Sequence, residues 1–233
     1  MNILIINQPP FNRGDESAHK GLIRTLLKRF PDAKIKVMHE AWLSESYRQY
    51  AVKDKRVEYF SEQQGCIKFP RFRNHDVFTN HTWLWKWHPT YRWTERIYKW
   101  ADIVVCAPGG ICMGGFQDWN HLYHLRLAQL FKRPLAYYGR SFGPFPTETE
   151  RNRQFKKISL DMLHYFGYLS IRDHKTELLA DELNIPYIST IDSAFLDSPK
   201  VEIPYELKSV VGNKPYMVFV PNYLLWHYAY KGR

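Results

Sequence analysis

Short apolar runs alternate with longer amphipathic stretches along most of this chain. Residues 3–6 and 35–38 are apolar runs of the length and composition typical of buried strands. Between them, apolar side chains recur at helical spacing, at Leu22, Ile23, Leu26, Leu27 and Phe30. A strand, a helix and a second strand in this order predict a parallel βαβ unit.

The same order of elements returns downstream. The pattern predicts further strands at residues 103–107, 135–138, 168–171 and 186–190. It predicts helices at residues 119–131, 151–166 and 175–183. Alternation of this kind is typical of a doubly wound α/β domain with a mostly parallel sheet, which we place over residues 1–198.

Proline and glycine interrupt the pattern of strands and helices after residue 198. Pro199, Pro204, Gly212 and Pro215 punctuate residues 199–215, which we interpret as a linker. Residues 216–221 have the pattern of a strand, so residues 216–233 are the start of a second domain or a C-terminal extension. A single strand with a short helix cannot bury a core of its own. Either this segment packs back on the first domain, or the chain is the front part of a longer architecture.

Composition and charge narrow the class of protein. The 233 residues are 45% hydrophobic and 24% charged, which is typical of a globular protein. The net charge of +10 favours polyanions, anionic membrane surfaces or phosphorylated substrates as partners. Residues 1–7 lack the features of a signal peptide, and no apolar run has the length of a membrane span, so we expect a cytoplasmic protein. Cys66, Cys106 and Cys112 lack zinc-finger spacing, and we expect buried free thiols.

Residues 71–100 are unusually rich in aromatic and basic side chains. They include nine aromatic residues, six Lys or Arg and three His, and they read as an insertion. Residues 83–87 alternate partly like a strand, whereas residues 91–100 fit a helix, and the pattern does not decide between them. Such a segment suits hydrophobic packing against the domain, a membrane interface, stacked sugar rings or single-stranded nucleic acid. No known nucleic-acid-binding motif accompanies it, so we expect no nucleic-acid partner.

Glycines, arginines and acidic residues follow the predicted strands. Ligands of an open α/β sheet bind beyond the carboxyl ends of its strands, where glycine exposes backbone N–H groups and arginine offers forked donors to anions. The combination predicts a cleft for a small anion. Its candidate residues are Asn12, Gly14, Asp15, Gly109, Gly110, Arg140, Arg172 and Asp192.

Several of these residues also have purely structural interpretations, which the sequence leaves open. Asp15 can cap a helix, Gly109 and Gly110 can form a plain turn, and Arg172 with Asp173 can make an ion pair or a cap. Asp192 can likewise cap a turn. The glycine pair is not part of a G-x-G-x-x-G motif, which disfavours a dinucleotide. We also expect no metal and no cofactor, since the His121 and His124 pair has no evident third ligand.

Five motifs in order resemble those of the polysaccharide pyruvyl transferase family. N-x-G-D-E is matched by residues 12–16, and the family's glycine-rich turn by Pro108-Gly109-Gly110, where a proline replaces the first of three glycines. The G-x-G-P-F type turn resembles residues 140–145. S-x-R-D matches residues 170–173, and D-x-A-F matches residues 192–195. The resemblance covers residues 1–196.

The resemblance implies a GT-B-like pair of Rossmann-type domains, with phosphoenolpyruvate as donor and a sugar of a cell-surface glycan, free or lipid-linked, as acceptor. Arg140, Arg172 and the amides of Gly109 and Gly110 would hold the donor's anionic groups. Asp15, Asp118 or Asp192 would orient or deprotonate the acceptor hydroxyls. The family usually has a second domain with further donor-binding residues, and this sequence ends as that domain would begin, so we expect the site to be completed from outside it.

Two other functions fit the same sequence. A protein that kept the fold without the donor domain would be a non-catalytic module that binds glycans or membrane surfaces. A GT-B glycosyltransferase would use a nucleotide sugar instead of phosphoenolpyruvate. The aromatic and basic stretch would in each case contact the sugar or the inner face of the membrane.

Overall fold

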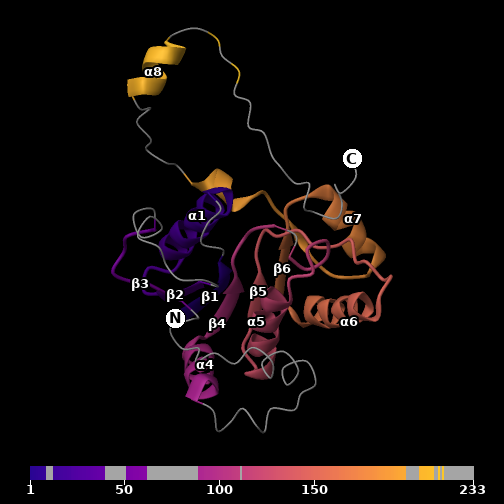
Figure 1. Cartoon of the computed structure of the whole chain (residues 1–233). Coiled ribbons are helices and arrows are strands. Elements are labelled where there is room, and N and C mark those ends of the chain that lie inside the picture. The colour runs from indigo at the N-terminus through magenta and orange to yellow at the C-terminus, as the bar shows by residue number, and fades with distance from the viewer. Residues whose placement is uncertain are drawn as a thin grey trace. The chain divides into compact units, whose positions relative to one another are not determined.

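The computed structural model describes residues 1–8, 13–39, 51–61, 89–110, 112–197, 205–212, 215 and 217 (Figure 1). The chain divides into two compact units, Met1–Asp197 and Ser198–Arg233. The predicted linker contains a short helix, α8 (Tyr205–Val211), in the second unit. The strand predicted at residues 216–221 lies outside the described residues, as do residues 83–87, Cys66 and Asn12.

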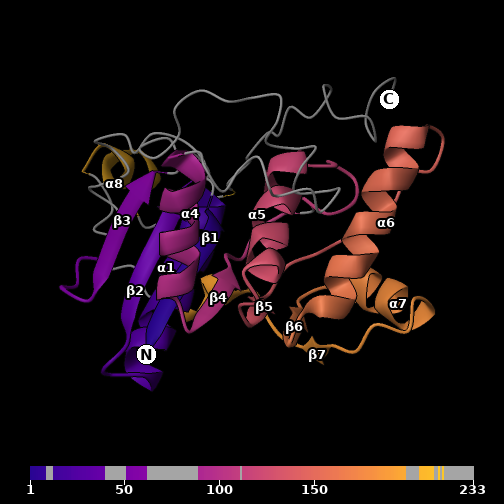
Figure 2. The same ribbon diagram turned by 90° about the horizontal axis from the view of Figure 1, so that it is seen from below.

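A parallel sheet of seven strands forms the centre of the first unit. In space the strands follow the order β3-β2-β1-β4-β5-β6-β7, which Figure 2 shows from one edge to the other. The predicted doubly wound α/β fold is therefore confirmed. The strands are β1 (Asn2–Gln8), β2 (Lys34–His39), β3 (Val57–Ser61), β4 (Ile103–Cys106), β5 (Leu135–Tyr137), β6 (Tyr168–Ile171) and β7 (Ile188–Ser189).

Helices cover both faces of the sheet. The helices of the first unit are α1 (Arg13–Arg29), α4 (Pro89–Trp100), α5 (Trp119–Leu130), α6 (Glu150–Tyr165), α7 (His174–Glu182) and the 3₁₀ helix η3 (Ser193–Leu196). The residues of β1 alternate between two cores: Ile3 and Ile5 pack with α1, whereas Leu4 and Ile6 pack with α4 and α5. A strand buried on both faces has no polar side, which explains the continuous apolar run.

One strand was missed by the sequence prediction, and one undecided segment is now assigned. β3 was not predicted, because its residues, VEYFS, mix polar and apolar types and only the last two are buried. The undecided segment at residues 91–100 is helical and forms most of α4. One face of α4, with Tyr91 and Tyr98, packs against Phe131 with ring centroids 5.6 Å apart in both cases, so this part of the aromatic stretch belongs to the core.

The order of the strands predicts where a ligand-binding crevice lies. The chain runs outward in one direction from β1 to β3 and in the other from β4 to β7, so the order reverses between β1 and β4. The connections from these two neighbouring strands leave toward opposite faces and open a space beyond their carboxyl ends. The segments that begin at Arg13 and at Ala107 therefore border the expected ligand position.

Two buried histidines lie near the carboxyl ends of β1 and β2. His19 of α1 and His39 of β2 are 1% and 0% exposed, and their ring centroids are 6.4 Å apart. Burial lowers the pKa of His39 to about 4, and burial together with the neighbouring His39 lowers the pKa of His19 well below 6.5. Both imidazoles are therefore neutral in the folded protein near neutral pH.

We expect this pair to make the fold acid-sensitive. Because the folded-state pKa of His39 is depressed, protons bind the unfolded chain more strongly, and stability falls as the pH decreases from about 6.5 toward 4. His39 alone accounts for a loss of about 2 kcal/mol between about pH 6.5 and about pH 5. Urea denaturation across this range measures the loss. His39→Gln should flatten the profile and the exposed-site control His164→Gln should not; equal profiles for all three proteins would contradict the assignment.

Candidate functional site

The loops after β4 and β5 lie against each other at the carboxyl edge of the sheet. Gly109 pairs with Arg140 and Gly114 with Gly143 in isolated parallel bridges, and the Gly143 N–H donates to the Met113 carbonyl at 2.7 Å. A Cβ atom at Gly114 would lie 2.4–2.7 Å from three backbone atoms of Gly143. Glycine at position 114 is what lets the two loops approach so closely.

Asp15, Gly109 and Arg140 meet at the crevice between β1 and β4. A Cβ atom added at Gly109 would lie 3.0 Å from Arg140 Nη2 and 3.2 Å from Asp15 Oδ1. The two side chains thus close over the glycine from α1 and from the loop after β5. Asp15 lies in the first turn of α1, not at its N-cap, because the helix begins at Arg13. The first turn favours a carboxylate through the helix dipole.

The Asp15 carboxyl lies among charges of both signs. Burial raises the pKa of Asp15 above its ordinary value, Arg140 and Arg172 oppose that rise, and Asp192 adds to it. The four side chains belong to segments that are far apart in the sequence, and their mutual electrostatic effect shows that the fold gathers them at one edge. A carboxyl whose pKa is raised exchanges protons more readily near neutral pH than an ordinary aspartate.

Arg140 lies inside the loops rather than on their surface. Its side chain is 1% exposed, Nη1 donates to the Ala107 carbonyl at 2.8 Å, and Nε donates to the Gly110 carbonyl at 3.3 Å. The guanidinium also contacts two sulfur atoms, Cys106 Sγ at 3.5 Å from Nη1 and Cys112 Sγ at 3.1 Å from Nη2. The guanidinium, expected from the sequence to contact a ligand, instead joins the two loops.

Arg172 pairs with Asp192 across the ends of β6 and β7. Arg172 Nη1 donates to Asp192 Oδ2, and the two side chains are 21% and 30% exposed. Arg172 thus combines an ion pair with surface that a ligand can reach. Asp192 also accepts a hydrogen bond from the Ala194 N–H at 2.9 Å and caps η3, which is the structural role that the sequence left open for it. The ion pair of Arg172 is with Asp192, whereas the sequence interpretation had paired it with Asp173.

The other residues of the S-x-R-D segment brace the site. Ser170 Oγ accepts the Gly139 N–H at 2.8 Å, and Asp173 caps α7 by accepting the Thr176 N–H at 3.0 Å. Asp173 Oδ2 also accepts the Ser141 hydroxyl at 2.5 Å. The bonds from Gly139 and Ser141 tie the loop after β5 to the end of β6, which fixes Arg172 relative to the glycine loops.

The D-x-A-F segment fastens the end of the first unit to α1. Ser193 Oγ donates to the Ala18 carbonyl at 2.8 Å, and Gly21 allows close contact, since a Cβ there would lie 2.0 Å from the Ser193 carbonyl oxygen. Arg24 and Asp197 form an ion pair beside this contact. Phe195 is 79% exposed, so the phenylalanine of the motif does not fill the core.

The remaining predicted residues have separate positions. A Cβ at Gly110 would meet no atom within 4 Å, so open space lies above this glycine. Gly14 is exposed in the first turn of α1. Asp118 caps α5, and its Oδ1 accepts the N–H groups of Asn120 and His121 at 2.9 and 3.0 Å. This capping role is the one the structure shows for Asp118, which was predicted as catalytic.

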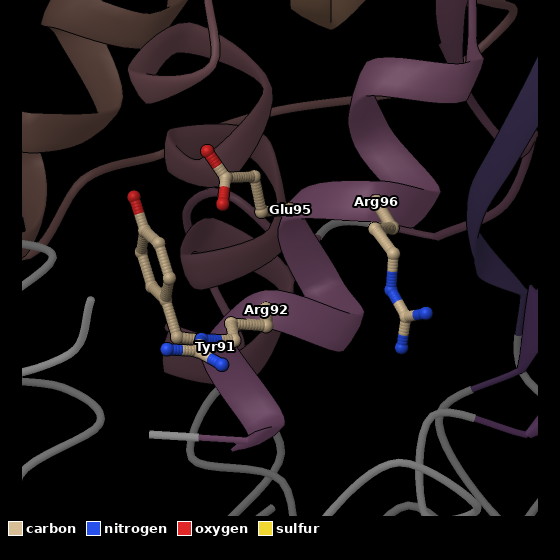
Figure 3. Close-up of a pocket in the computed structure, with 4 residues that line it drawn as sticks. All are labelled: Tyr91, Arg92, Glu95 and Arg96. Atoms are coloured by element: carbon tan, nitrogen blue, oxygen red, sulfur yellow. The ribbon is translucent and has the colours of Figure 1, made fainter. Parts of the chain in front are cut away.

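A cavity of about 620 Å³ lies beside α4 and is lined by Tyr91, Arg92, Glu95 and Arg96. Figure 3 shows the Tyr91 ring and the Glu95 carboxylate on one side of the helix, with Arg96 pointing away from them. None of the four residues that line this cavity belongs to the candidate site at the carboxyl ends of the strands. Part of the aromatic and basic stretch therefore lines a cavity that has room for a polar ring, such as that of a sugar.

A family model matches most of the chain. The model of the family described as polysaccharide pyruvyl transferase matches residues 12–230. The chain belongs to the polysaccharide pyruvyl transferase family. The match includes the segments of this transferase that hold Asp15, Gly109, Arg140, Arg172 and Asp192. No curated protein matches the sequence significantly.

The two thiols of this pyruvyl transferase family member have a contact that the sequence did not predict. Cys106 is buried as predicted, but Cys112 is partly exposed, and neither forms a disulfide. Their contact with Arg140 is invisible in the sequence because the three residues come from separate segments. His121 and His124 are engaged too: His121 Nε2 lies 3.8 Å from Cys106 Sγ, and His124 Nδ1 lies 3.2 Å from the Tyr98 hydroxyl.

The described residues contain neither a cluster of metal ligands nor a membrane-spanning helix. Within the part of the chain that the structure describes, no three His, Cys, Asp or Glu side chains group closely enough to hold a metal ion. Over the same residues, none of the helices combines the length and the apolar character that crossing a membrane requires.

Proposed function

We propose that this protein transfers an enolpyruvyl unit from phosphoenolpyruvate to a sugar of a cell-surface polysaccharide and forms a pyruvate ketal. The observation that supports it most is the gathering of Asp15, Gly109, Arg140, Arg172 and Asp192 at the carboxyl edge of the sheet, in a member of this family. We place the reaction in the cytoplasm, where the thiols of Cys106 and Cys112 would stay reduced. Met1–Asp197 would be the first Rossmann-type half of a GT-B-type enzyme.

Arg172 is the donor-binding arginine of this proposal. A guanidinium binds carboxylate and phosphate through paired charge-assisted hydrogen bonds, and phosphoenolpyruvate carries both groups. Arg172 has exposed surface, whereas Arg140 is buried and its guanidinium donates to backbone carbonyls. We therefore assign donor contact to Arg172 and a supporting role to Arg140. The open space above Gly110 gives an anionic group access to the loop.

The reaction needs one proton on carbon and two deprotonated hydroxyls. Protonation of the donor's methylene carbon makes C2 cationic, a sugar hydroxyl attacks it, phosphate leaves, and a second hydroxyl closes the ketal. Asp15 is our candidate for moving a proton at the hydroxyls, since burial raises its pKa. The charges of Arg172 and Asp192 also act on the Asp15 carboxyl. Asp192 orients Arg172, and Asp118 takes no chemical role in the proposal because it caps α5.

We assign the acceptor side to the aromatic and basic stretch. On α4, Arg92, Arg96 and Lys99 recur at helical spacing and are exposed, and Glu95 pairs with Lys99 at 2.7 Å. The cavity beside this helix combines an aromatic ring with charged groups, as sugar-binding surfaces do. A glycan, or its lipid carrier at the inner face of the membrane, would meet this surface.

A transfer assay tests the proposed function. Purified protein is incubated with phosphoenolpyruvate and a panel of oligosaccharide and lipid-linked acceptors, and inorganic phosphate and acceptor mass are followed together. We expect phosphate release that depends on one acceptor class and matches the gain of a carboxylated ketal on that acceptor. Asp15→Asn should lower the rate about 100-fold, whereas Asp102→Asn, on the opposite edge of the sheet at the amino end of β4, should not.

The outcomes separate the rival functions. Acceptor binding without phosphoenolpyruvate binding or phosphate release would indicate a non-catalytic glycan- or membrane-binding module. Consumption of a nucleotide sugar would indicate a glycosyltransferase. Either result would overturn the proposal.

A further inference from the structure

The loop after β4 holds one thiol at its surface in a defined position. The Cys112 N–H donates to the Gly110 carbonyl at 3.0 Å, and the Cys112 carbonyl accepts the Asp118 N–H at 3.0 Å. Asp118 is in turn the cap of α5. The backbone on both sides of the sulfur is therefore fixed by the glycine turn and by the start of a helix.

A buried cation lies against this thiol. Cys112 Sγ is 3.1 Å from Arg140 Nη2, and Cys106 Sγ is 3.5 Å from Nη1 of the same guanidinium. A guanidinium that is 1% exposed needs negative charge nearby, because burial of an unpaired charge is costly. The two carbonyl oxygens that it contacts carry only partial charge. Thiolates supply a full charge, and neutral thiols do not.

The electrostatics of Arg140 agree with this geometry. Burial by itself lowers the pKa of Arg140, but nearby negative charge, first of Cys112 and then of Cys106, outweighs burial and raises it above its ordinary value. Attraction between two groups is mutual, so the guanidinium stabilises negative charge on the sulfur atoms that face it. Tyr137 stays protonated because burial raises its pKa well above 10.

Other titratable groups act on Arg140 from neighbouring elements. Asp15 of α1 interacts with Arg140 electrostatically and competes with the thiols for its charge. His121 of α5 faces Cys106, and burial with the nearby Arg140 keeps its pKa well below 6.5, so it adds no positive charge near neutral pH. Arg172 acts on Asp15 and on Tyr137 in the same direction as Arg140.

Exposure distinguishes the two cysteines. Cys106 is 0% exposed, whereas Cys112 is partly exposed. Nucleophilic reaction requires both thiolate character and access for the reagent. Cys112 combines contact with the guanidinium and partial exposure, whereas Cys106 has the contact alone.

We propose that Cys112 is a nucleophilic thiolate held by Arg140 and is a modification site for small hydroperoxides. The thiolate sulfur attacks one oxygen of hydrogen peroxide, the O–O bond breaks, and hydroxide leaves. The sulfur is oxidised by two electrons to a sulfenic acid and the peroxide is reduced to hydroxide and the bound hydroxyl. The site does not depend on the proposed transfer reaction.

The test measures alkylation of the full chain by iodoacetamide as a function of pH. Each cysteine-containing peptide is quantified by mass spectrometry. An ordinary thiol reacts about 80-fold more slowly at about pH 6 than at about pH 8, because its thiolate fraction falls by that factor. We expect the rate at Cys112 to change less than about threefold over this range. Glutathione in the same tube is the reference thiol.

Two variants identify the cause. Arg140→Gln should restore the steep pH profile at Cys112, whereas Cys106→Ser should leave it flat. If Arg140→Gln does not fold, the profile of the unmodified protein still decides. With hydrogen peroxide, a dimedone adduct should form at Cys112 ahead of Cys106. A Cys112 rate that follows glutathione, or a dimedone adduct first at Cys106, would overturn the proposal.

Discussion

Gly114→Ala should lower the free energy of unfolding by about 4 kcal/mol, a large stability effect for a single methyl group. The added Cβ would overlap the backbone N, Cα and C atoms of Gly143, and backbone atoms cannot rotate away as a side chain can. The residue also has φ +142°, a conformation that alanine rarely adopts. Chemical denaturation followed by circular dichroism gives the measurement.

Gly110→Ala is the matched control. The same methyl group enters open space, and φ at Gly110 is not positive, so stability should change by less than about 0.5 kcal/mol. The proposed donor site should nevertheless respond, because the methyl group occupies the space assigned to an anionic group. Equal stability losses for the two variants would mean that the loops after β4 and β5 are not packed as described.

Arg172→Ala should reduce kcat/KM for phosphoenolpyruvate about 100- to 1000-fold, the largest effect on activity that we expect from one substitution. The variant removes the fork proposed to hold the donor's charge, and Asp192 then faces the same donor as an uncompensated carboxylate. Steady-state phosphate release with varied phosphoenolpyruvate is the measurement. Arg153→Ala removes an exposed arginine that pairs with Glu150 on α6, and it should change the rate less than about twofold.

Asp192→Asn separates donor contact from mere structural support. It removes the charge that pairs with Arg172 and keeps an oxygen able to accept the Ala194 N–H. We expect a loss of about tenfold, because Arg172 is less well oriented but still present. If Asp192→Asn costs as much as Arg172→Ala, Arg172 acts only through its ion pair.

The framework of this fold could be predicted from the sequence because its central strands are buried on both faces. The runs at residues 3–6 and 103–107 are continuous and apolar, so their type and order were clear. β3 lies at the edge of the sheet with a partly exposed, mixed composition, and it gave no clear pattern. The aromatic stretch was left undecided because the strand-like alternation at residues 83–87 lies next to the helical spacing at residues 91–100.

The site was predictable in position and not in detail. Residues after parallel strands reach one edge of a sheet in any fold of this class, which is why Asp15, Gly109 and Arg172 could be named together. The depth of each side chain depends on loop packing, which sequence spacing does not encode. Arg140 and Arg172 have similar sequence surroundings, yet one is 1% exposed and contacts two thiols, while the other pairs with Asp192 near the surface.

We propose above all that the carboxyl edge of the sheet binds phosphoenolpyruvate through Arg172. Titration calorimetry of the purified protein with phosphoenolpyruvate, and separately with nucleotide sugars, tests it most directly. We expect saturable binding of phosphoenolpyruvate that is at least about tenfold weaker in Arg172→Ala and unchanged in Arg153→Ala. Equal phosphoenolpyruvate affinity in Arg172→Ala, with the circular dichroism spectrum unchanged, or binding of a nucleotide sugar in place of phosphoenolpyruvate, would contradict it.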